Sequence, residues 1–245
     1  MILVPYHLDE RLDGLEADLP GPPDTVVTAE LPDGDIWARL GTLYDRVADR
    51  VAAEVTAGGR PVVVSGDCTV SLGTVAGLQR AGVEPGVVWL DAHGDVQTLE
   101  TTTSGYIGGM PLRILVGYRP ELIAERLGLR PVPEERAVLV DARDLDPAEA
   151  EYLAVARLQR YDIENVRTPD GPLLVHVDLD VVDPADVPGL LFPVGGGPSA
   201  AAVVGAVAGL MATGRIVALD LACTWRPDGG DERRRKLVTA LTKGL

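Results

Sequence analysis

Short apolar runs alternate along the chain with longer segments that are apolar on one side only. The runs at 62–64, 87–90, 137–140 and 173–175 contain no polar side chain, which is typical of strands buried on both faces of a parallel sheet. Further strands are predicted at 2–6, 158–161 and 216–221, and helices at 36–57, 70–80, 148–157, 200–212 and 231–243. This alternation predicts one three-layer α/β/α domain with a mainly parallel sheet, over residues 1–245.

Charge and composition restrict the classes of partner. The formal net charge of -15 argues against a nucleic-acid or anionic-membrane surface and is compatible with a cationic substrate. No apolar run is long enough to span a bilayer, and the N-terminal segment lacks the features of a signal peptide, so we expect a cytoplasmic protein. Two cysteines are too few for a disulfide scaffold.

Two of the apolar runs lead directly into groups of metal-ligand residue types. Asp91, His93 and Asp95 follow the run 87–90. If that strand stays extended through Asp95, the three side chains share one face and converge at the carboxyl end of the strand. The same alternation applies to His176, Asp178 and Asp180, which follow the run 173–175.

Carboxylates placed this closely on buried strands repel one another and are costly to desolvate unless a cation lies between them. Two such strand ends therefore suggest two divalent ions with bridging carboxylates. The alternative is that one pair of aspartates caps a helix and the other lies in a turn. The occurrence of the same arrangement at two strand ends favours the metal centre.

Three segments together resemble the ureohydrolase family of arginase, agmatinase and their relatives. They are Ser65-Gly66-Asp67-Cys68, Asp91-Ala92-His93-Gly94-Asp95 and Asp178-Leu179-Asp180, and the likeness extends from about 61 to 227. The resemblance implies an arginase-like fold and two manganese ions. One ion would be held by Cys68, Asp91, Asp95 and Asp178, and the other by Asp91, His93, Asp178 and Asp180.

The first ligand of the family pattern is a histidine, and this chain has Cys68 there. A thiolate is a softer ligand than an imidazole, so zinc or iron becomes more competitive with manganese. His176 lies deeper on its strand than Asp178. We therefore expect it to hydrogen-bond a ligand carboxylate rather than bind metal directly.

Two further segments resemble the substrate-binding parts of the arginase branch. The loop Thr101-Thr102-Thr103-Ser104-Gly105, with Gln97 before it, is similar to the segment that binds the substrate α-carboxylate. By this likeness Gln97, Thr102 and Ser104 would contact that carboxylate. Arg143-Asp144-Leu145-Asp146 with Glu149 looks like the segment that grips the α-ammonium group, through Asp146. The resemblance implies a small-molecule, arginine-like amino-acid substrate.

Three positions depart from arginases, namely Cys68, Gly108 and Cys223, and the first of them narrows the substrate. Cys68 and the segment after the threonines resemble the branch that hydrolyses Nω-hydroxy-L-arginine in cycloserine biosynthesis, and Gly108 replaces a loop histidine. Cys223 aligns with the glutamate that holds the guanidinium group, and a neutral thiol cannot supply its charge. A one-residue shift of that alignment leaves Asp220, Thr224 or, beyond the turn, Asp228 and Asp231 as substitutes.

These features predict a hydrolase of C–N bonds in linear amidines that uses a metal-bridging hydroxide, with Asp95 transferring a proton to the leaving nitrogen. One alternative is an amide or other C–N hydrolase acting on a modified amino acid. Another is a degenerate homologue that keeps the fold without catalysis. The resemblance also allows a homo-oligomer.

Overall fold

The computed structural model describes residues 1–244, in which eight strands form one sheet with parallel pairing throughout. In spatial order the strands are β4 (Thr25–Val26), β1 (Ile2–Val4), β5 (Val62–Ser65), β10 (Ile216–Ala222), β9 (Leu173–Asp178), β6 (Gly86–Asp91), β7 (Ala137–Asp141) and β8 (Gln159–Tyr161). A separate antiparallel pair is formed by β2 (Tyr6–His7) and β3 (Glu10–Arg11). From β5 the chain continues in one direction along the sheet through β6 and β7 to β8, and it then returns to place β9 and β10 between β5 and β6.

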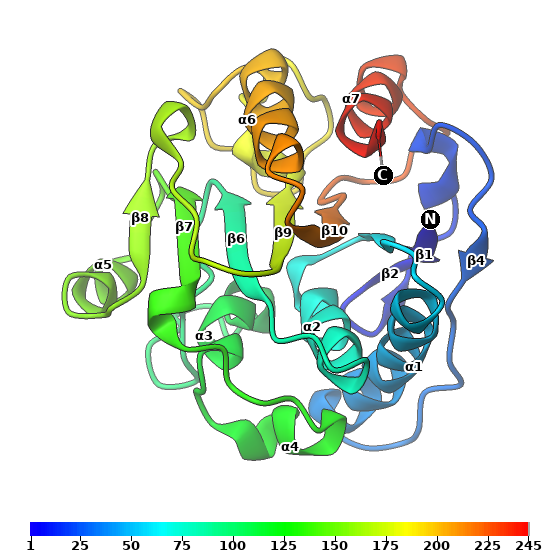
Figure 1. Ribbon diagram of the computed structural model, residues 1–245, viewed down its shortest axis with the longest axis vertical. Helices are drawn as coiled ribbons and strands as arrows, with labels where there is room; N and C mark the ends of the chain where they lie inside the picture. The colour runs from blue at the N-terminus through cyan, green and yellow to red at the C-terminus, as the bar shows by residue number, and fades with distance from the viewer. Residues whose placement is uncertain (245) are drawn as a thin grey trace.

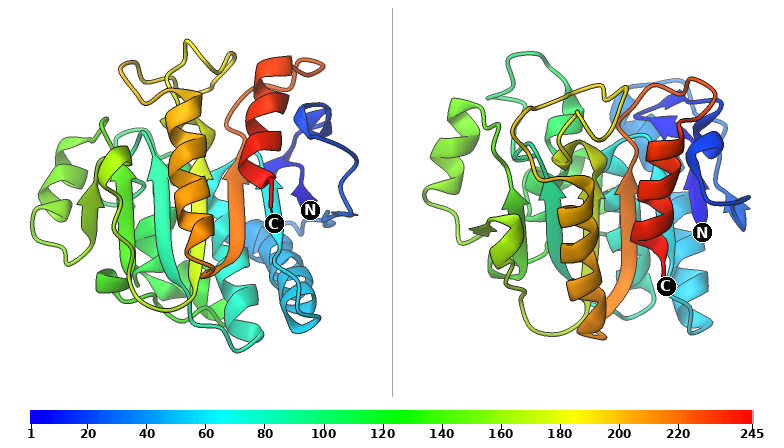
Figure 2. Two further views of the ribbon diagram at one scale, coloured as in Figure 1. Left: turned by 45° about the horizontal axis from the view of Figure 1, so that its top comes forward. Right: turned by 90° about the horizontal axis from the view of Figure 1, so that it is seen from above.

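Helices cover both faces of this sheet (Figures 1 and 2). On one side lie α1 (Ile36–Thr56), α2 (Ser71–Arg80), α3 (Pro111–Leu115) and α4 (Ala124–Leu127), and on the other lie α6 (Ala200–Ala212) and α7 (Glu232–Thr242). The short helix α5 (Pro147–Leu153) lies beside the β8 edge. The predicted three-layer α/β/α architecture with a parallel sheet is confirmed. The 3-10 turns are η1 (Leu15–Asp18), η2 (Cys68–Val70), η3 (Ile107–Gly109), η4 (Pro120–Leu122), η5 (Glu134–Arg136), η6 (Ile163–Asn165) and η7 (Leu179–Val181).

Each face of the sheet has its own apolar core. Alternate residues of a strand point to opposite faces, so Val87 and Trp89 pack toward α1 and α2, whereas Val88 and Leu90 pack toward α6 and α7. This is why the central strands are apolar at consecutive positions, as parallel sheets require. The predicted first strand is split, because β1 ends before Pro5, which has no N–H to donate to a neighbouring strand.

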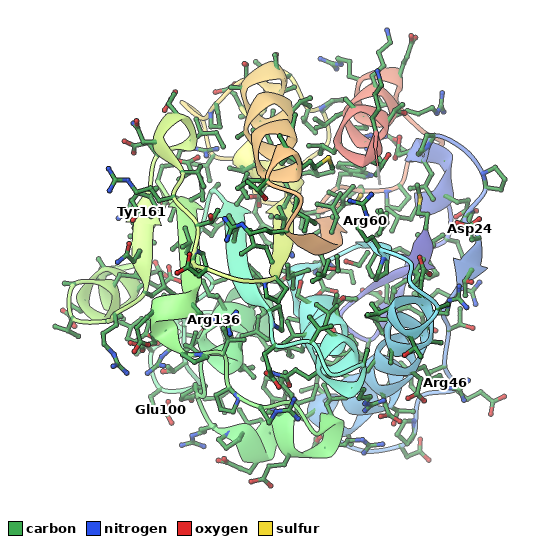
Figure 3. All side chains as sticks on the ribbon, in the orientation of Figure 1. Asp24, Arg46, Arg60, Glu100, Arg136 and Tyr161 are labelled. Carbon is green, nitrogen blue, oxygen red and sulfur yellow. The ribbon has the colours of Figure 1, made fainter. Side chains whose placement is uncertain are left out.

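The surface carries the charge that the composition implies. Charged side chains such as Asp24, Arg46, Arg60 and Glu100 lie at the periphery (Figure 3). Within residues 1–244, no helix combines the length and the apolar character that crossing a membrane requires.

Candidate metal centre

The sheet brings three aspartate turns together at the carboxyl ends of its strands. β6 and β9 are neighbours and end at Asp91 and Asp178. Each of these carboxylates accepts a hydrogen bond from the backbone N–H two residues on, Asp91 from His93 at 2.7 Å and Asp178 from Asp180 at 2.9 Å. After β5, Asp67 accepts from the N–H of Thr69 at 2.8 Å. Aspartate favours this local turn. Here the turns lie at the carboxyl ends of the strands, where open α/β sheets bind ligands.

The predicted extension of the strand through Asp95 is wrong. β6 ends at Asp91, and Asp95 has a φ of 53°, which is the left-handed region. Asp180 likewise lies in the turn η7 rather than in β9. The side chains converge because the carboxylates of Asp91 and Asp178 turn the backbone back over the strand ends, not because of the strand pleat.

The potential metal donors form two groups that share one residue. One donor atom from each of Asp91, His93 and Asp180 lies within 4.8 Å of the others, and the same holds for Cys68, Asp91 and His176. Nδ1 of His93 lies 3.3 Å from Oδ1 of Asp91 and 3.3 Å from Oδ2 of Asp180. We call the first group the His93 half-site and the second the Cys68 half-site. Asp178 joins the Cys68 half-site through its Oδ2, which accepts from the thiol of Cys68 at 2.9 Å.

Burial and crowding perturb these groups strongly. Burial and the nearby carboxylates raise the pKa values of Asp95 and Asp178 well above the ordinary range, and the pKa of Asp180 to about 6. Burial likewise raises the pKa of the Cys68 thiol, with the charge of Asp178 adding to the effect. For His93 burial acts in the opposite direction, but the close carboxylates of Asp180 and Asp91 raise its pKa to about 12. The cluster therefore requires positive charge, which protons or cations can provide.

Several atoms of the cluster also lack partners. Oδ2 of Asp95, both carboxylate oxygens of Asp180 and Nε2 of His176 are buried and make no hydrogen bond within residues 1–244. Unsatisfied buried polar atoms are costly, and carboxylate, imidazole and thiol donors together are the ligand types of divalent transition metals. These residues fit a pair of divalent ions that bridge the strand ends.

A cavity of about 140 Å³ opens above the cluster. Most of the residues predicted to form the site line it: Cys68, His93, Asp95, Gln97, Thr102, Ser104, Asp146, Glu149, Asp178 and Asp180. Asp91 lies beneath the cavity with 1% of its surface exposed. The structure thus brings the predicted metal ligands and most of the predicted substrate contacts to one place.

The rim opposite the aspartate turns is built on the first turn of α5. Glu149 accepts hydrogen bonds from the N–H groups of Val96 and Asp146, both at 3.1 Å, and Asp146 accepts from the side chain of Gln97 at 2.6 Å. A Cβ atom at Gly94 would lie 2.8 Å from Oε1 of Glu149. Glycine at this position lets the ligand turn pack closely against the rim.

The structure places Cys223 outside the cavity. Cys223 follows β10, is fully buried and packs in the core under α6 and α7, whereas the next residue, Thr224, lines the cavity. The hydroxyl of Thr224 donates to Oδ1 of Asp178 at 2.6 Å. The placement therefore favours the one-residue shift that put Thr224 in the site, and it removes Cys223 from contact with substrate.

His176 is buried beside the cluster, and one of its ring nitrogens bonds to a residue outside the cluster. Its Nδ1 lies 2.8 Å from the hydroxyl of Ser71, and burial lowers its pKa to about 3. The expected hydrogen bond to a ligand carboxylate does not form within residues 1–244.

An aromatic group at the cavity mouth was not predicted. The hydroxyl of Tyr106 lies 3.0 Å from Nε2 of His7, whose Nδ1 lies 3.0 Å from the carbonyl oxygen of Gly66. The ring of Phe192 lies 5.3 Å from that of Tyr106. A side chain at Gly108 would overlap the Tyr106 ring, so this ring fills the space over Gly108. His7 comes from the opposite end of the sequence, and no local pattern links it to Tyr106.

Comparisons with known proteins agree with this geometry. The Arginase family profile matches residues 18–227. The chain is 37% identical over 172 residues to an arginase of Brevibacillus brevis and 34% identical over 172 residues to one of Bacillus subtilis. In each case the match covers 63% of this chain and 58% of the relative, so the chain spans less than two thirds of those proteins.

Solved structures extend the likeness to nearly the whole chain. The arginase of Bacillus caldovelox superposes with a TM-score of 0.83 at 27% identity, covering 98% of this chain and 94% of that one. The arginase of Bacillus cereus superposes with a TM-score of 0.82 at 28% identity, with the same coverage. With the family profile spanning most of its length and the donor residues gathered at one sheet edge, the chain belongs to the arginase family.

Proposed function

We propose that this protein hydrolyses a C–N bond in the guanidino group of an arginine-like amino acid, with two divalent metal ions as cofactors. The observation that carries the proposal is the cavity itself. Its floor holds buried carboxylates with unpartnered oxygens, and its rim carries groups of opposite hydrogen-bonding character. Bound divalent ions supply a water-derived nucleophile near neutral pH and polarise the group under attack.

Asp95 is suited to the proton transfer. Its carboxyl group lines the cavity, and its buried Oδ2 has no partner within residues 1–244. Burial and the neighbouring carboxylates raise the pKa of Asp95 in the metal-free protein, and bound cations would act in the opposite direction. We assign Asp95 the role of accepting the proton of the attacking water and passing it to the departing nitrogen.

The rim suits the charged ends of an amino acid. Thr102 and Ser104 present hydroxyl groups that can donate to an α-carboxylate, and Gln97 lies between them and the acidic side of the rim. Asp146, with Glu149 behind it, offers a carboxylate to an α-ammonium group. A zwitterionic head group would thus be held at two points, which orients the guanidino end toward the floor.

Nω-hydroxy-L-arginine is the substrate that we propose. The cavity has a neutral Thr224 near Asp178 and an aromatic side chain over Gly108, so it offers no carboxylate from β10 to pair with a full guanidinium charge. An N-hydroxyguanidine is less basic than a guanidine and depends less on such a pair. The same observation favours the second candidate, hydrolysis of an amide in a modified amino acid.

A substrate panel tests the proposal. Protein loaded with manganese or with zinc is assayed for ornithine release from Nω-hydroxy-L-arginine and L-arginine, for putrescine release from agmatine, and for hydrolysis of an amide such as L-glutamine. We expect the highest kcat/KM with Nω-hydroxy-L-arginine, loss of turnover in Asp95→Asn, and no loss in Asp162→Asn, the same change at an exposed carboxylate. Turnover of the amide alone would replace the first candidate by the second, and no turnover of any substrate would support a degenerate homologue.

A further inference from the structure

His176 is held rigidly below the Cys68 half-site. It lies on β9 with 1% of its surface exposed, two residues before Asp178. Its ring stacks on the indole of Trp89, with the centroids 3.6 Å apart and the planes 21° from parallel. The same indole donates its N–H to Oδ2 of Asp91 at 3.1 Å. Trp89 thus fixes the positions of His176 and of the shared carboxylate together.

A buried hydroxyl occupies one nitrogen of this ring. Nδ1 of His176 lies 2.8 Å from Oγ of Ser71. In the tautomer in which Nδ1 carries the proton and donates it to Ser71, the other ring nitrogen, Nε2, has a free lone pair. Metal-binding histidines are held by this kind of hydrogen bond from the nitrogen that does not bind the metal.

The ring of His176 belongs to a group of donors with the dimensions of a metal site. Nε2 is buried and has no hydrogen-bond partner within residues 1–244. One donor atom from each of Cys68, Asp91 and His176 lies within 4.8 Å of the other two. Metal–ligand bonds of about 2.0–2.3 Å allow one ion to reach three atoms at such separations.

We propose that His176 binds a metal ion directly through Nε2, so that the Cys68 half-site has sulfur, nitrogen and oxygen donors. This inference rests on the metal centre of the proposed function and adds a ligand to it. A thiolate and an imidazole together prefer zinc or ferrous iron over manganese, whereas the His93 half-site, with one imidazole and carboxylates, suits manganese. The two half-sites would then differ in the metal that they prefer.

The chain has three histidines, His7, His93 and His176, so nitrogen labelling can assign them individually. The test is NMR of full-length protein labelled with ¹⁵N-histidine and loaded with ¹¹³Cd²⁺, a probe that accepts thiolate, imidazole and carboxylate ligands. We expect a thiolate-shifted ¹¹³Cd resonance with one-bond coupling to Nε2 of His176. A second, less shifted resonance should couple to His93, and His7 should show no coupling.

Variants sharpen the assignment. His176→Asn should remove the coupling and weaken cadmium binding at the thiolate-shifted resonance by about 10- to 100-fold. His7→Asn, the same change at the cavity mouth, should leave both resonances in place. If His176→Asn fails to fold, the coupling in the unmutated protein decides the question alone.

The proposal is overturned if the thiolate-shifted resonance shows no coupling to His176, or if cadmium does not bind at Cys68. The first result leaves the proposed hydrolase activity intact. Coupling to His176 in a protein that turns over no substrate would leave this inference standing and overturn the proposed function alone.

Discussion

The two half-sites share Asp91 but differ in their access to solvent. At the Cys68 half-site, Cys68, Asp91 and His176 have 4%, 1% and 1% of their surfaces exposed. At the His93 half-site, the side chain of His93 is 29% exposed. Closed metal sites serve structure and stability, whereas sites with an open position serve catalysis. An ion at the Cys68 half-site would therefore lie deeper in the fold than one at the His93 half-site.

The same difference appears in the supporting residues. Behind the Cys68 half-site lie Trp89, whose indole stacks on His176, and Ser71, whose hydroxyl lies 2.8 Å from Nδ1 of His176. The His93 half-site is supported by the turn in which Asp91 accepts the N–H of His93 and by the edge contact of the His93 ring with Phe192 at the cavity mouth. Substitutions at the Cys68 half-site should therefore lower stability and metal retention, whereas substitutions at the His93 half-site should lower turnover.

The largest effect is expected where the half-sites meet. Asp91→Asn removes the carboxylate common to both and should lower the metal content below two ions per chain. Loss of several kcal/mol of transition-state stabilisation corresponds to a decrease in kcat of about 10³-fold or more. Metal analysis and steady-state kinetics measure this, with Asp162→Asn as the control. Retention of two ions with kcat within tenfold of the unmutated protein would show that Asp91 does not bridge.

A smaller effect should distinguish the half-sites by metal preference. Cys68→His replaces the soft donor by the residue of the family pattern and should shift the ratio of manganese to zinc affinity toward manganese by about tenfold or more. Competition titration with a chelator measures the ratio. Cys223→Ala, which removes the other buried thiol, should leave it unchanged. An equal shift in both variants would mean that Cys68 does not bind the metal.

The pH dependence of stability should report the titration of the buried carboxyl group of Asp220. Burial raises the pKa of Asp220 from 3.8 to about 7. A carboxyl group whose pKa is raised by folding stabilises the fold fully below its unfolded pKa, and this contribution is lost as the pH rises through its folded pKa. Metal-free protein should therefore lose stability between about pH 4 and pH 7, and Asp220→Asn should flatten that dependence by on the order of 1 kcal/mol per pH unit.

Urea unfolding of chelated protein from pH 4.5 to pH 8 measures this dependence. Asp162→Asn is the matched control, because Asp162 is an exposed aspartate with the same chemical change. An unchanged slope in Asp220→Asn would place the titrating groups elsewhere.

The smallest effect on activity is expected from the aromatic group at the cavity mouth. Tyr106→Phe keeps the ring that covers Gly108 but loses the hydrogen bond with His7. One neutral hydrogen bond contributes about 1 kcal/mol, so kcat/KM should fall about fivefold. Tyr161→Phe, which removes a hydroxyl remote from the cavity, should be neutral. A change of more than a hundredfold would instead give Tyr106 a direct part in the reaction.

The fold was largely predictable because its signals are local. Apolar runs located β5, β6, β7 and β10 within one residue at each end, whereas β9 continues three residues past its apolar run. Asp35 caps α1 by accepting the N–H of Ala38 at 2.8 Å. Short elements at the periphery, such as β4 and α4, were not predicted. They are only two and four residues long and depend on tertiary packing rather than on a periodic pattern.

The site was predictable in its residue types but not in its geometry. The aspartates of two strand ends indicated a metal centre, yet the strand pleat does not continue to Asp95 or Asp180. The directions of those side chains depend on turns that form through side-chain hydrogen bonds. The contacts of His176 with Trp89 and Ser71, and of His7 with Tyr106, join residues from different elements. A single sequence carries no periodic signal for them.

The most direct test of the central claim, that paired cations hold these carboxylates together, is anomalous diffraction from crystals of protein loaded with manganese and zinc. Data collected at both absorption edges locate and identify each ion. The account predicts two peaks roughly 3.5–4 Å apart, on either side of Asp91, one beside Cys68 and the other between His93 and Asp180. A single peak, or peaks that do not contact Asp91, would contradict it.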